Sequence, residues 1–482
     1  MKIKRLGWQA KLFSLGFLLI IAGLVRLYRI GNPLLDWHAF RQADTASVTR
    51  EYVKNGVDLL RPTYHDHSNI QSGQDNPEGY RMVEFPLVNV LLASILRTFP
   101  ALGLTLISRL ASVAASLGTL VFLYRFTINV TGEQKIAWLA GLFYALLPYS
   151  IYYSRVVLPE PFLLLFSMGS LYWLTEALQQ KKLITSWQWW ASAVSLGLAF
   201  LLKPFVSFLA PLFLAVIWQA RKKHSFLNPW WLLYGLLAIG PLWWWRAWIE
   251  QFPSGIPASD WLFNSNGIRF RPAWFRWLFF ERFTKLILGF TGVLLAAPAL
   301  IWSRNKTKQI IWSWSLGLLA YLSIIATGNV QHDYYQVIFV PLISFVLGAG
   351  FWHAWQKYQQ PVMKVGLAIL AALMLVLSWR QIAGYFNVNH WEYVEAGQAV
   401  DRLTPTDAKI IAPAFGDTMF LFQTNRTGWP IGFEIADKIS KGADYYVTTS
   451  YDDEARELEE QYQVIEKTDL YLLIKLEEGS AE

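Results

Sequence analysis

The chain has 482 residues, of which 54% are hydrophobic, 16% aromatic and only 16% charged. Soluble proteins average about 45–50% apolar and about 25% charged residues, so this composition excludes a disordered or collagen-like chain and argues against an ordinary soluble enzyme. The sequence contains no cysteine. Its absence excludes disulfide bonds, zinc–thiolate sites and a cysteine nucleophile.

The net charge of +8 is distributed unevenly along the chain. Residues 386–482 contain 19 Asp and Glu against 8 Lys and Arg, a net charge of −11, whereas the first 385 residues carry a net charge of +19. The basic part is also the hydrophobic part. Basic residues that flank apolar segments are typical of membrane proteins, so we expect membrane lipids and no nucleic acid as partners.

Long apolar segments dominate the first 380 residues. An α-helix needs roughly 20 mostly apolar residues to cross about 30 Å of hydrocarbon, and these segments lack the polar stripe of a soluble helix. The sequence therefore predicts a mainly α, polytopic membrane protein with about 11 transmembrane helices. The predicted spans are 12–29, 105–126, 136–153, 161–178, 187–202, 205–220, 229–248, 277–302, 309–327, 336–355 and 362–380.

The orientation follows from the lysines and arginines of the short loops, which stay on the cytoplasmic side. One set of connections holds nearly all of these basic residues, and Glu133 is almost the only acid among them. We therefore expect a cytoplasmic N-terminus and an extracytoplasmic C-terminal region. The basic residues are Lys2, Lys4, Arg5, Lys11, Arg125, Lys135, Lys181, Lys182, Arg221, Lys222, Lys223, Arg304, Lys306, Lys308, Lys357 and Lys364.

The segment from Phe85 to Pro100 is apolar as well, but counting it as a span would reverse the charge rule for the loops that follow. We therefore predict an amphipathic helix in the outer interface. Two extramembrane segments result, a first outer loop at about 31–104 and an acidic tail. The predicted domains are a transmembrane catalytic domain at 1–384 and an extracytoplasmic domain at 385–482.

The tail has the pattern of a small α/β domain. Alternating or β-branched runs predict four strands, with helical patterns between them, for example at Asp452–Tyr462. The predicted strands are Lys409–Pro413, Tyr445–Ser450, Gln463–Lys467 and Leu470–Leu476.

Ionisable groups at a membrane edge are costly, so each one suggests a function. The densest set opens the first loop. Asp44 fits a general base or a metal ligand, and Arg41 fits a partner for it or a phosphate ligand. The alternative is an interfacial helix with solvated charges and Trp37 as its anchor. The segment is Asp36-Trp37-His38-Ala39-Phe40-Arg41-Gln42-Ala43-Asp44-Thr45.

Further along the first loop, Glu84 directly precedes the predicted interfacial helix. Two carboxylates from one loop, Asp44 and Glu84, are suitable ligands for a hard divalent cation such as Mg²⁺ or Mn²⁺. His65 and His67 are optional further ligands, although histidines two residues apart in a polar loop are usually only solvated.

Polar groups also follow later spans. The second outer loop holds Arg155 and Glu160, and Lys203 lies between two apolar runs, where an anionic lipid phosphate would satisfy it. The alternatives are an Arg155–Glu160 pair that caps two helices and a Lys203 that snorkels to the interface. A third loop carries His332-Asp333-Tyr334-Tyr335, whose tyrosines also suit an aromatic belt. All these groups fall on the outer side of the predicted topology, where loops can converge on one cavity.

Together these motifs resemble the GT-C glycosyltransferases. They are most similar to the protein O-mannosyltransferase (family 39) group and to the bacterial aminoarabinose transferases of lipid A. The resemblance covers roughly residues 1–380 and rests on the 37–45 motif, Glu84-Phe85-Pro86, the Arg155–Glu160 segment, Lys203-Pro204 and the 332–335 motif. One departure concerns the base: the better-known relatives carry adjacent Asp-Glu in the first loop, whereas this chain has Ala43-Asp44 with Asp36 upstream.

The resemblance implies transfer of a sugar from a polyprenyl-phosphate-linked donor to an extracytoplasmic acceptor, in a bacterial inner (plasma) membrane. The acceptor, a protein, lipid or glycan, is not specified by the sequence. The implied catalytic residues are Asp44, favoured as the base, Glu84 and Asp36. The implied substrate-binding residues are Arg41, His38, Arg155, Glu160, Lys203, His332, Tyr334 and Tyr335, and the implied ligands of a cation are Asp44 and Glu84. One displacement at the anomeric carbon predicts inversion.

The strongest alternative is a transporter or flippase of lipid-linked glycans, which would also have about a dozen spans and buried charges. Such proteins usually show internal repeats and helices broken near the bilayer midplane. The sequence shows neither feature, and its polar groups gather at one interface.

Overall fold

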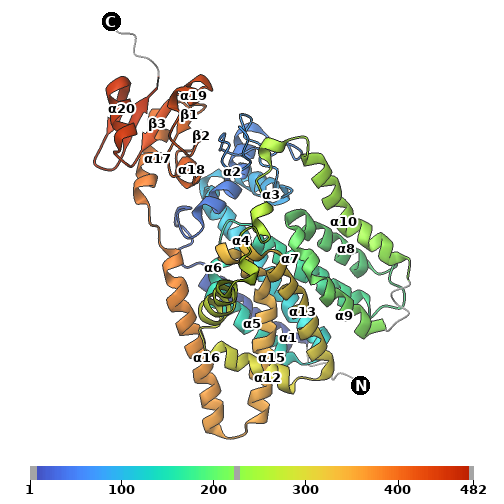
Figure 1. The fold of residues 1–482 in the computed structure, drawn as a ribbon. Coiled ribbons are helices and arrows are strands. Elements are labelled where there is room, and N and C mark those ends of the chain that lie inside the picture. Colours follow the sequence, from blue (N-terminus) through green and yellow to red (C-terminus); the bar gives the residue numbers. More distant parts are fainter. Residues whose placement is uncertain (1–7, 222–227, 477–482) are drawn as a thin grey trace. The chain divides into compact units, whose positions relative to one another are not determined.

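The structure is a computed structural model that describes residues 8–221 and 228–476 (Figure 1). The predicted cytoplasmic residues Lys2, Lys4, Arg5, Lys222 and Lys223 lie outside this range. The chain forms two compact units, each described by itself. The first unit comprises Met1–Ile30, Leu110–Trp245 and Ser259–Gly384, and the second comprises Gly31–Arg109, Arg246–Ala258 and Tyr385–Glu482.

The first unit is built of helices, as the apolar segments predict. Each of the eleven predicted spans is largely helical. The α-helices are α1 (Trp8–Arg26), α4 (Leu104–Thr131), α5 (Gln134–Leu146), α6 (Pro148–Tyr153), α7 (Glu160–Ala177), α8 (Trp187–Leu202), α9 (Ala210–Arg221), α10 (Trp230–Ile249), α11 (Pro272–Phe275), α12 (Gly292–Trp302), α13 (Asn305–Ile324), α14 (Ala326–Gln331), α15 (Val340–Lys357) and α16 (Pro361–Ile382). Shorter or irregular turns are η2 (Pro204–Leu209), η5 (Asp260–Leu262), η6 (Ile268–Phe270), the π-helix η7 (Arg276–Ile287), η8 (Asp333–Phe339) and η9 (Ala383–Phe386).

By length and composition alone, three helical segments of the described chain are long and apolar enough to cross a membrane. They are Leu104–Thr131, Asp333–Lys357 and Pro361–Leu403, and a bent pair, Pro272–Ile287 with Gly292–Trp302, passes the same test together. The other predicted spans are shorter or divided helices. The count of about 11 spans therefore stays a prediction.

The predicted span 277–302 is wrong as a single straight helix. Its two halves are bent by 104° at the break between η7 and α12. Gly289 has φ of +46° there, and an added Cβ would lie 2.2 Å from the carbonyl oxygen of Met374. The next residue, Phe290, also has a positive φ of 61°. Only glycine fits this close approach with this backbone conformation, so the chain turns instead of continuing as a helix.

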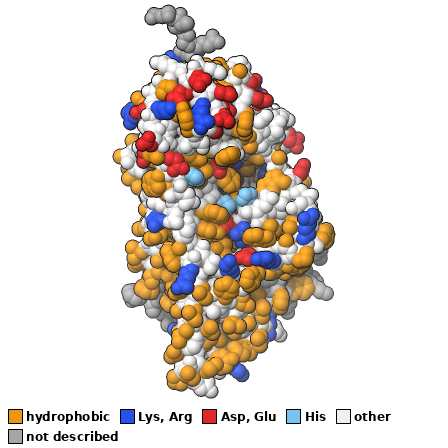
Figure 2. All heavy atoms as spheres, turned by 60° about the vertical axis from the view of Figure 1, so that its left-hand side comes forward, with side chains coloured by type: hydrophobic (Ala, Val, Ile, Leu, Met, Phe, Trp, Pro, Cys, Tyr) orange, Lys and Arg blue, Asp and Glu red, His pale blue; other side chains and the backbone are white. Residues whose placement is uncertain are grey.

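The helical unit exposes many hydrophobic side chains, and one face of it is seen in the lower part of Figure 2, where orange predominates. Large apolar side chains on α10 and α16 are widely exposed: Leu232 is 80% exposed, Trp243 75% and Val362 72%. A soluble protein rarely exposes so much contiguous apolar surface, and lipid would cover it at no cost.

The second unit combines the first outer loop with the tail. Its helices are α2 (Ala39–Asn55), α3 (Leu87–Thr98), η1 (Pro100–Leu102), η4 (Pro253–Gly255), α17 (Trp391–Leu403), α18 (Met419–Gln423), α19 (Ile435–Ser440) and α20 (Asp453–Gln461). The amphipathic helix expected at 85–100 is α3, which buries Leu92, Ala93 and Leu96. Its location at a membrane interface stays a prediction.

The tail contains a five-stranded sheet of order β2-β1-β3-β5-β4. Its strands are β1 (Lys409–Ile411), β2 (Thr427–Trp429), β3 (Tyr445–Thr448), β4 (Gln463–Lys467) and β5 (Leu472–Lys475). β1 is parallel to β2 and β3, whereas β5 is antiparallel to β3 and β4. All four predicted strands are confirmed; β2 was not predicted, because it is three residues long and has glycine at its centre.

Helices cover both faces of this sheet. One apolar core joins the sheet to α17 and α18 through Ala396, Val400, Phe420 and Leu421, and it also contains Leu35 of the first loop. The opposite core joins the sheet to α19 and α20. The first loop also pairs with β2, because the Gly428 amide donates to the His65 carbonyl at 2.9 Å. The predicted division into 1–384 and 385–482 stays a prediction.

Candidate active site

Asp44 lies in the second turn of α2 and is 1% exposed. Its carboxylate accepts from three side chains that come from three different segments. Arg81 Nη2 is 2.9 Å and Gln71 Nε2 3.1 Å from Oδ2, and Thr418 Oγ1 is 2.7 Å from Oδ1. The Arg81 ion pair and the two hydrogen bonds fix the orientation of this carboxylate.

The arginine beside Asp44 is itself held from two sides. Arg81 lies over the ring of Tyr64, 5.0 Å from its centroid, and also donates to the Gln71 side-chain oxygen. The Tyr64 hydroxyl in turn donates to Asp66 at 3.2 Å. Burial raises the pKa of Asp66 to about 6. These contacts hold Arg81 in place independently of its ion pair with Asp44.

Glu84 and Arg41 form an ion pair in the same unit. The pair joins the start of α2 to the loop that precedes α3. His38, where the backbone adopts φ of 59° just before α2, lies against Trp37 and Phe40, with ring centroids 5.1 and 6.1 Å away.

Asp36 has a different environment. It forms a fully buried ion pair with Arg109 at 2.9 Å, and Gln42 donates to its other oxygen at 2.7 Å. Arg109 also donates to the Asn32 carbonyl at 2.7 Å. These contacts attach the start of the first loop to the beginning of α4, which is a structural task. A catalytic role for Asp36 stays a prediction.

Among residues 8–221 and 228–476 there is no group of three or more His, Asp or Glu side chains that could hold a metal ion. Asp44 and Glu84, the predicted ligands, are each paired with an arginine. His65 and His67 are kept neutral, because burial lowers their pKa values to about 3 and about 4. A divalent cation would have to displace both arginines, so the residues as arranged do not fit one.

The helical unit contains a separate pocket. Its lining includes Glu160, Lys203, Tyr334 and Tyr335, four predicted substrate-binding residues, together with Tyr321. Lys203 forms an ion pair with Glu160, and its Nζ lies 5.3 and 5.4 Å from the ring centroids of Tyr334 and Tyr335.

The helix ends explain how these residues reach the pocket. α7 begins at Glu160, just after Pro159 and before Pro161, so the carboxylate is placed at a helix N-terminus. α8 ends at Leu202, and Lys203 adopts an extended conformation before Pro204. Proline disfavours helical geometry in the preceding residue, which turns Lys203 out of the helix.

The remaining predicted residues of this unit lie near the same loops. Asp333 is fully buried, accepts from the Tyr153 hydroxyl and pairs with Arg282 at 3.5 Å. His332 stacks on Tyr334 with ring centroids 5.4 Å apart.

Arg155 is fully buried, lies over the Tyr152 ring at 5.6 Å and donates to the Arg29 carbonyl at 3.1 Å. No Arg155–Glu160 ion pair is found among the described residues, where Glu160 pairs with Lys203 instead. Asp44 and Glu84 belong to one unit, whereas Glu160, Lys203 and His332 belong to the other. Their convergence on one cavity stays a prediction.

Sequence reasoning missed several polar contributors. Gln71 and Thr418 bind Asp44, and Tyr321 lines the pocket of Lys203. Asp417, next to Thr418, is a further acid near Asp44. None of them stands in a motif, so only their contacts reveal them.

Asp417 provides a pH-dependent effect on stability. Burial and then the charge of Asp44 raise the pKa of Asp417 to about 6 from 3.8. Because the pKa is raised in the folded state, folding favours the protonated carboxyl. The contribution of Asp417 to stability is therefore fully present below about pH 4 and is lost as the pH rises through 6. We expect Asp417→Asn to raise the free energy of unfolding by about 1–2 kcal/mol at pH 8 and to leave it unchanged near pH 4.

Thermal unfolding in detergent at the two pH values checks this prediction, with an expected increase of about 2–4 °C at pH 8 only. Asp453→Asn is the control, because the Asp453 side chain is 93% exposed. An equal increase at both pH values would show that charge burial is not the cause.

With the geometry described, the chain can be compared with known proteins. The family model "PMT: Dolichyl-phosphate-mannose-protein mannosyltransferase" matches residues 94–258. Residues 94–258 form a PMT-family domain. The PMT-family domain contains Arg155, Glu160 and Lys203, whereas Asp44 and Glu84 precede it and His332 follows it. No curated protein matches the chain in sequence.

Solved structures share the fold at low sequence identity. ArnT from Cupriavidus metallidurans bound to undecaprenyl phosphate has a TM-score of 0.69 at 12% identity, over 96% of this chain and 98% of that chain. The Archaeoglobus fulgidus oligosaccharyltransferase in the apo form has a TM-score of 0.57 at 11% identity, over 92% and 70%.

A further structure, the same archaeal enzyme, AglB, in complex with an inhibitory peptide and a dolichol-phosphate, has a TM-score of 0.55 at 12% identity, over 92% and 70% of the two chains. The PMT-family domain and the shared fold indicate a GT-C glycosyltransferase, as the sequence motifs predict.

Proposed function

We propose that the protein is an integral-membrane glycosyltransferase that moves a sugar from a polyprenyl-phosphate-linked donor to an acceptor outside the cytoplasm. The observation that carries this proposal is the Lys203 pocket, a buried ammonium group beside aromatic rings, in a fold shared with an ArnT bound to undecaprenyl phosphate. We further propose the bacterial inner membrane as its location, with a cytoplasmic N-terminus and an extracytoplasmic tail.

The pocket has the chemistry that a lipid phosphate needs. Lys203 is 9% exposed and is neutralised by Glu160. Glu160 Oε2 has no hydrogen-bond partner among the described residues. A phosphate that binds Lys203 would replace one negative partner by another, while Leu163, Leu164 and Ile338 offer apolar contacts to the first part of the polyprenyl chain.

In the proposed reaction, Asp44 accepts the proton of the acceptor hydroxyl, and the oxygen attacks the anomeric carbon. The new C–O bond forms as the bond from that carbon to the donor phosphate breaks, and the phosphate leaves with the bonding electrons. Lys203 compensates the charge that develops on the leaving group. A single displacement inverts the anomeric configuration. The hydroxyl approaches Asp44 by taking the place of one of its three present donors.

The residues as arranged do not fit a divalent cation, so the proposed reaction has no step through one. One of the structurally similar proteins, the Archaeoglobus fulgidus oligosaccharyltransferase, is known in complex with Zn and sulfate. In this chain the two arginines already supply positive charge at Asp44 and Glu84.

The test is incubation of the purified protein in detergent with radiolabelled polyprenyl-phosphate sugars and mixed acceptors, with and without EDTA. We expect transfer or slow donor hydrolysis with at least one sugar, an inverted product by NMR, and less than about a twofold loss with EDTA, because charge compensation by Lys203 needs no metal. A large loss that Mg²⁺ or Mn²⁺ restores would instead assign a cation to the site.

A folded sample without transfer or hydrolysis for any sugar would contradict the proposal. Movement of the intact lipid-linked sugar across vesicle membranes would then favour the transporter. The break between η7 and α12 is a feature that transporters share.

A further inference from the structure

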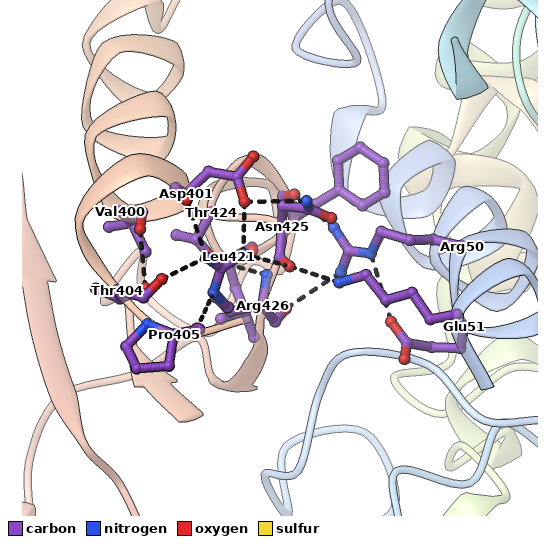
Figure 3. A network of polar contacts seen from close by, with 12 residues as sticks. Arg50, Glu51, Val400, Asp401, Thr404, Pro405, Leu421, Thr424, Asn425 and Arg426 are labelled. Carbon is purple, nitrogen blue, oxygen red and sulfur yellow. Dashed lines mark hydrogen bonds and ion pairs between the residues drawn. The ribbon is translucent and has the colours of Figure 1, made fainter. Parts of the chain in front are cut away.

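Helix α18 of the tail lies against helix α2, and the two are bonded at both ends of α18. At its start, the Thr418 hydroxyl donates to Asp44 at 2.7 Å. At its end, Arg50 donates to the Phe422 carbonyl at 2.8 Å and to the Arg426 carbonyl at 3.2 Å. Figure 3 shows Arg50 reaching toward the turn that carries Arg426. The helix that carries Asp44 is therefore fixed to the α/β domain.

The α18 side of this contact is rigid. Arg426 is 1% exposed and donates to the Pro405 carbonyl at 2.7 Å, to the Thr404 carbonyl at 2.9 Å and to the Asp401 carboxylate at 2.6 Å (Figure 3). These partners belong to the end of α17 and the turn after it. Movement of α18 within the tail would break this buried network, and movement of α18 away from α2 would break the Arg50 bonds.

Burial and hydrogen bonds fix the position of Thr418. It is 2% exposed, and its carbonyl accepts from His65 Nε2 at 3.2 Å. Its hydroxyl is 3.4 Å from the Phe40 carbonyl but 2.7 Å from Asp44, so its single proton goes to the carboxylate. The two residues before Asp417 have positive φ, 54° at Phe415 and 83° at Gly416. A non-glycine residue keeps such a strained conformation only where the surroundings require it.

We propose that Thr418 is a positioning residue for Asp44, so that the C-terminal α/β domain forms part of the reaction site. This inference rests on the proposed function, in which Asp44 is the base. Arg81 and Gln71 both bind Oδ2, and Thr418 alone among the three binds Oδ1. Without the hydroxyl, Arg81 and Gln71 still hold Oδ2, but Oδ1 loses the contact that fixes it, and a base must stay within hydrogen-bond reach of the proton it takes.

The test compares Thr418→Val, which keeps the shape and removes the hydroxyl, with Thr418→Ser, which keeps the hydroxyl. We expect Val to lower kcat about 10- to 100-fold, with donor KM changed less than about threefold, and Ser to stay within about threefold of wild type.

Thr404→Val is the matched control. Thr404 is a buried threonine of the same domain whose hydroxyl donates only within its own helix, to the Val400 carbonyl at 2.8 Å. This variant should lose a similar amount of thermal stability without the change in kcat. Thermal unfolding of all three variants shows how much of any loss is due to misfolding.

The outcomes separate the two proposals. A wild-type protein that transfers sugar, with a Thr418→Val variant of unchanged kcat, overturns the positioning role and leaves the function standing. Equal losses for Thr418→Val and Thr418→Ser, or for Thr404→Val, also overturn it. A folded wild type without transfer or donor hydrolysis overturns the proposed function and this inference with it.

Discussion

Asp44→Asn should lower the rate of sugar transfer by about 100- to 10,000-fold while leaving donor binding nearly unchanged. Positioned general bases contribute rate factors of this size, and an amide of the same shape cannot take the proton of the acceptor hydroxyl. The measurement is single-turnover transfer from the radiolabelled donor identified in the wild type, with donor binding followed separately by competition with unlabelled polyprenyl phosphate.

The control for this variant is Asp401→Asn. It also removes a carboxylate that pairs with a buried arginine of the same unit, Arg426, which keeps its carbonyl partners. We expect this control to transfer within about threefold of wild type, because Asp401 touches no reacting group. An Asp44→Asn protein that turns over within a few fold of the parent would show that another group is the base, and Asp36 would be the next to replace.

Lys203→Met should lower kcat/KM for the lipid-linked donor by at least about 100-fold, because a charged hydrogen bond to phosphate in a buried pocket is worth about 3 kcal/mol. The same change also leaves Glu160 as a buried charge without its cation, a loss of about 3–5 kcal/mol in stability. A loss of activity in the single variant therefore has two causes, the lost phosphate contact and the destabilised fold, and this variant alone does not separate them.

The double variant Lys203→Met with Glu160→Gln separates these effects. It removes both charges, so we expect it to recover most of the thermal stability while donor use stays at least about 100-fold low. Lys364→Met is the control, because the Lys364 ammonium lies over the Trp355 ring, 5.3 Å from its centroid, and does not line the pocket. Full donor use by the double variant would contradict a phosphate role for Lys203.

The sequence predicts most of the fold, because local patterns control most of it. β-branched runs locate β1, β3, β4 and β5, and the amphipathic pattern locates α3. The break after Ile287 was not predicted, because it depends on how closely Gly289 approaches the Met374 carbonyl, 85 positions later in the chain. Composition gives the apolar character of a segment but not such a contact.

For the candidate site too, the sequence predicts some residues and misses others. Costly charges at predicted membrane edges reveal Lys203 and Glu160, and the pocket brings them together. Thr418 could not be predicted, because an ordinary threonine acquires its task only through a contact with a residue 374 positions away. The Lys203–Glu160 pair could not be predicted for a related reason: proximity in sequence favours Arg155 as the partner of Glu160, whereas the helix ends bring Lys203 to Glu160.

The bond between α2 and the tail also sets an order of events during synthesis. At about 5–20 residues per second, a ribosome that has completed Asp44 needs about 20–75 s to reach Thr418. Throughout that interval Asp44 and Arg50 lack their partners in the tail, the Thr418 hydroxyl and the carbonyls of Phe422 and Arg426. We therefore expect this contact to be among the last parts of the fold to form, and until then its two surfaces stay accessible to chaperones and proteases.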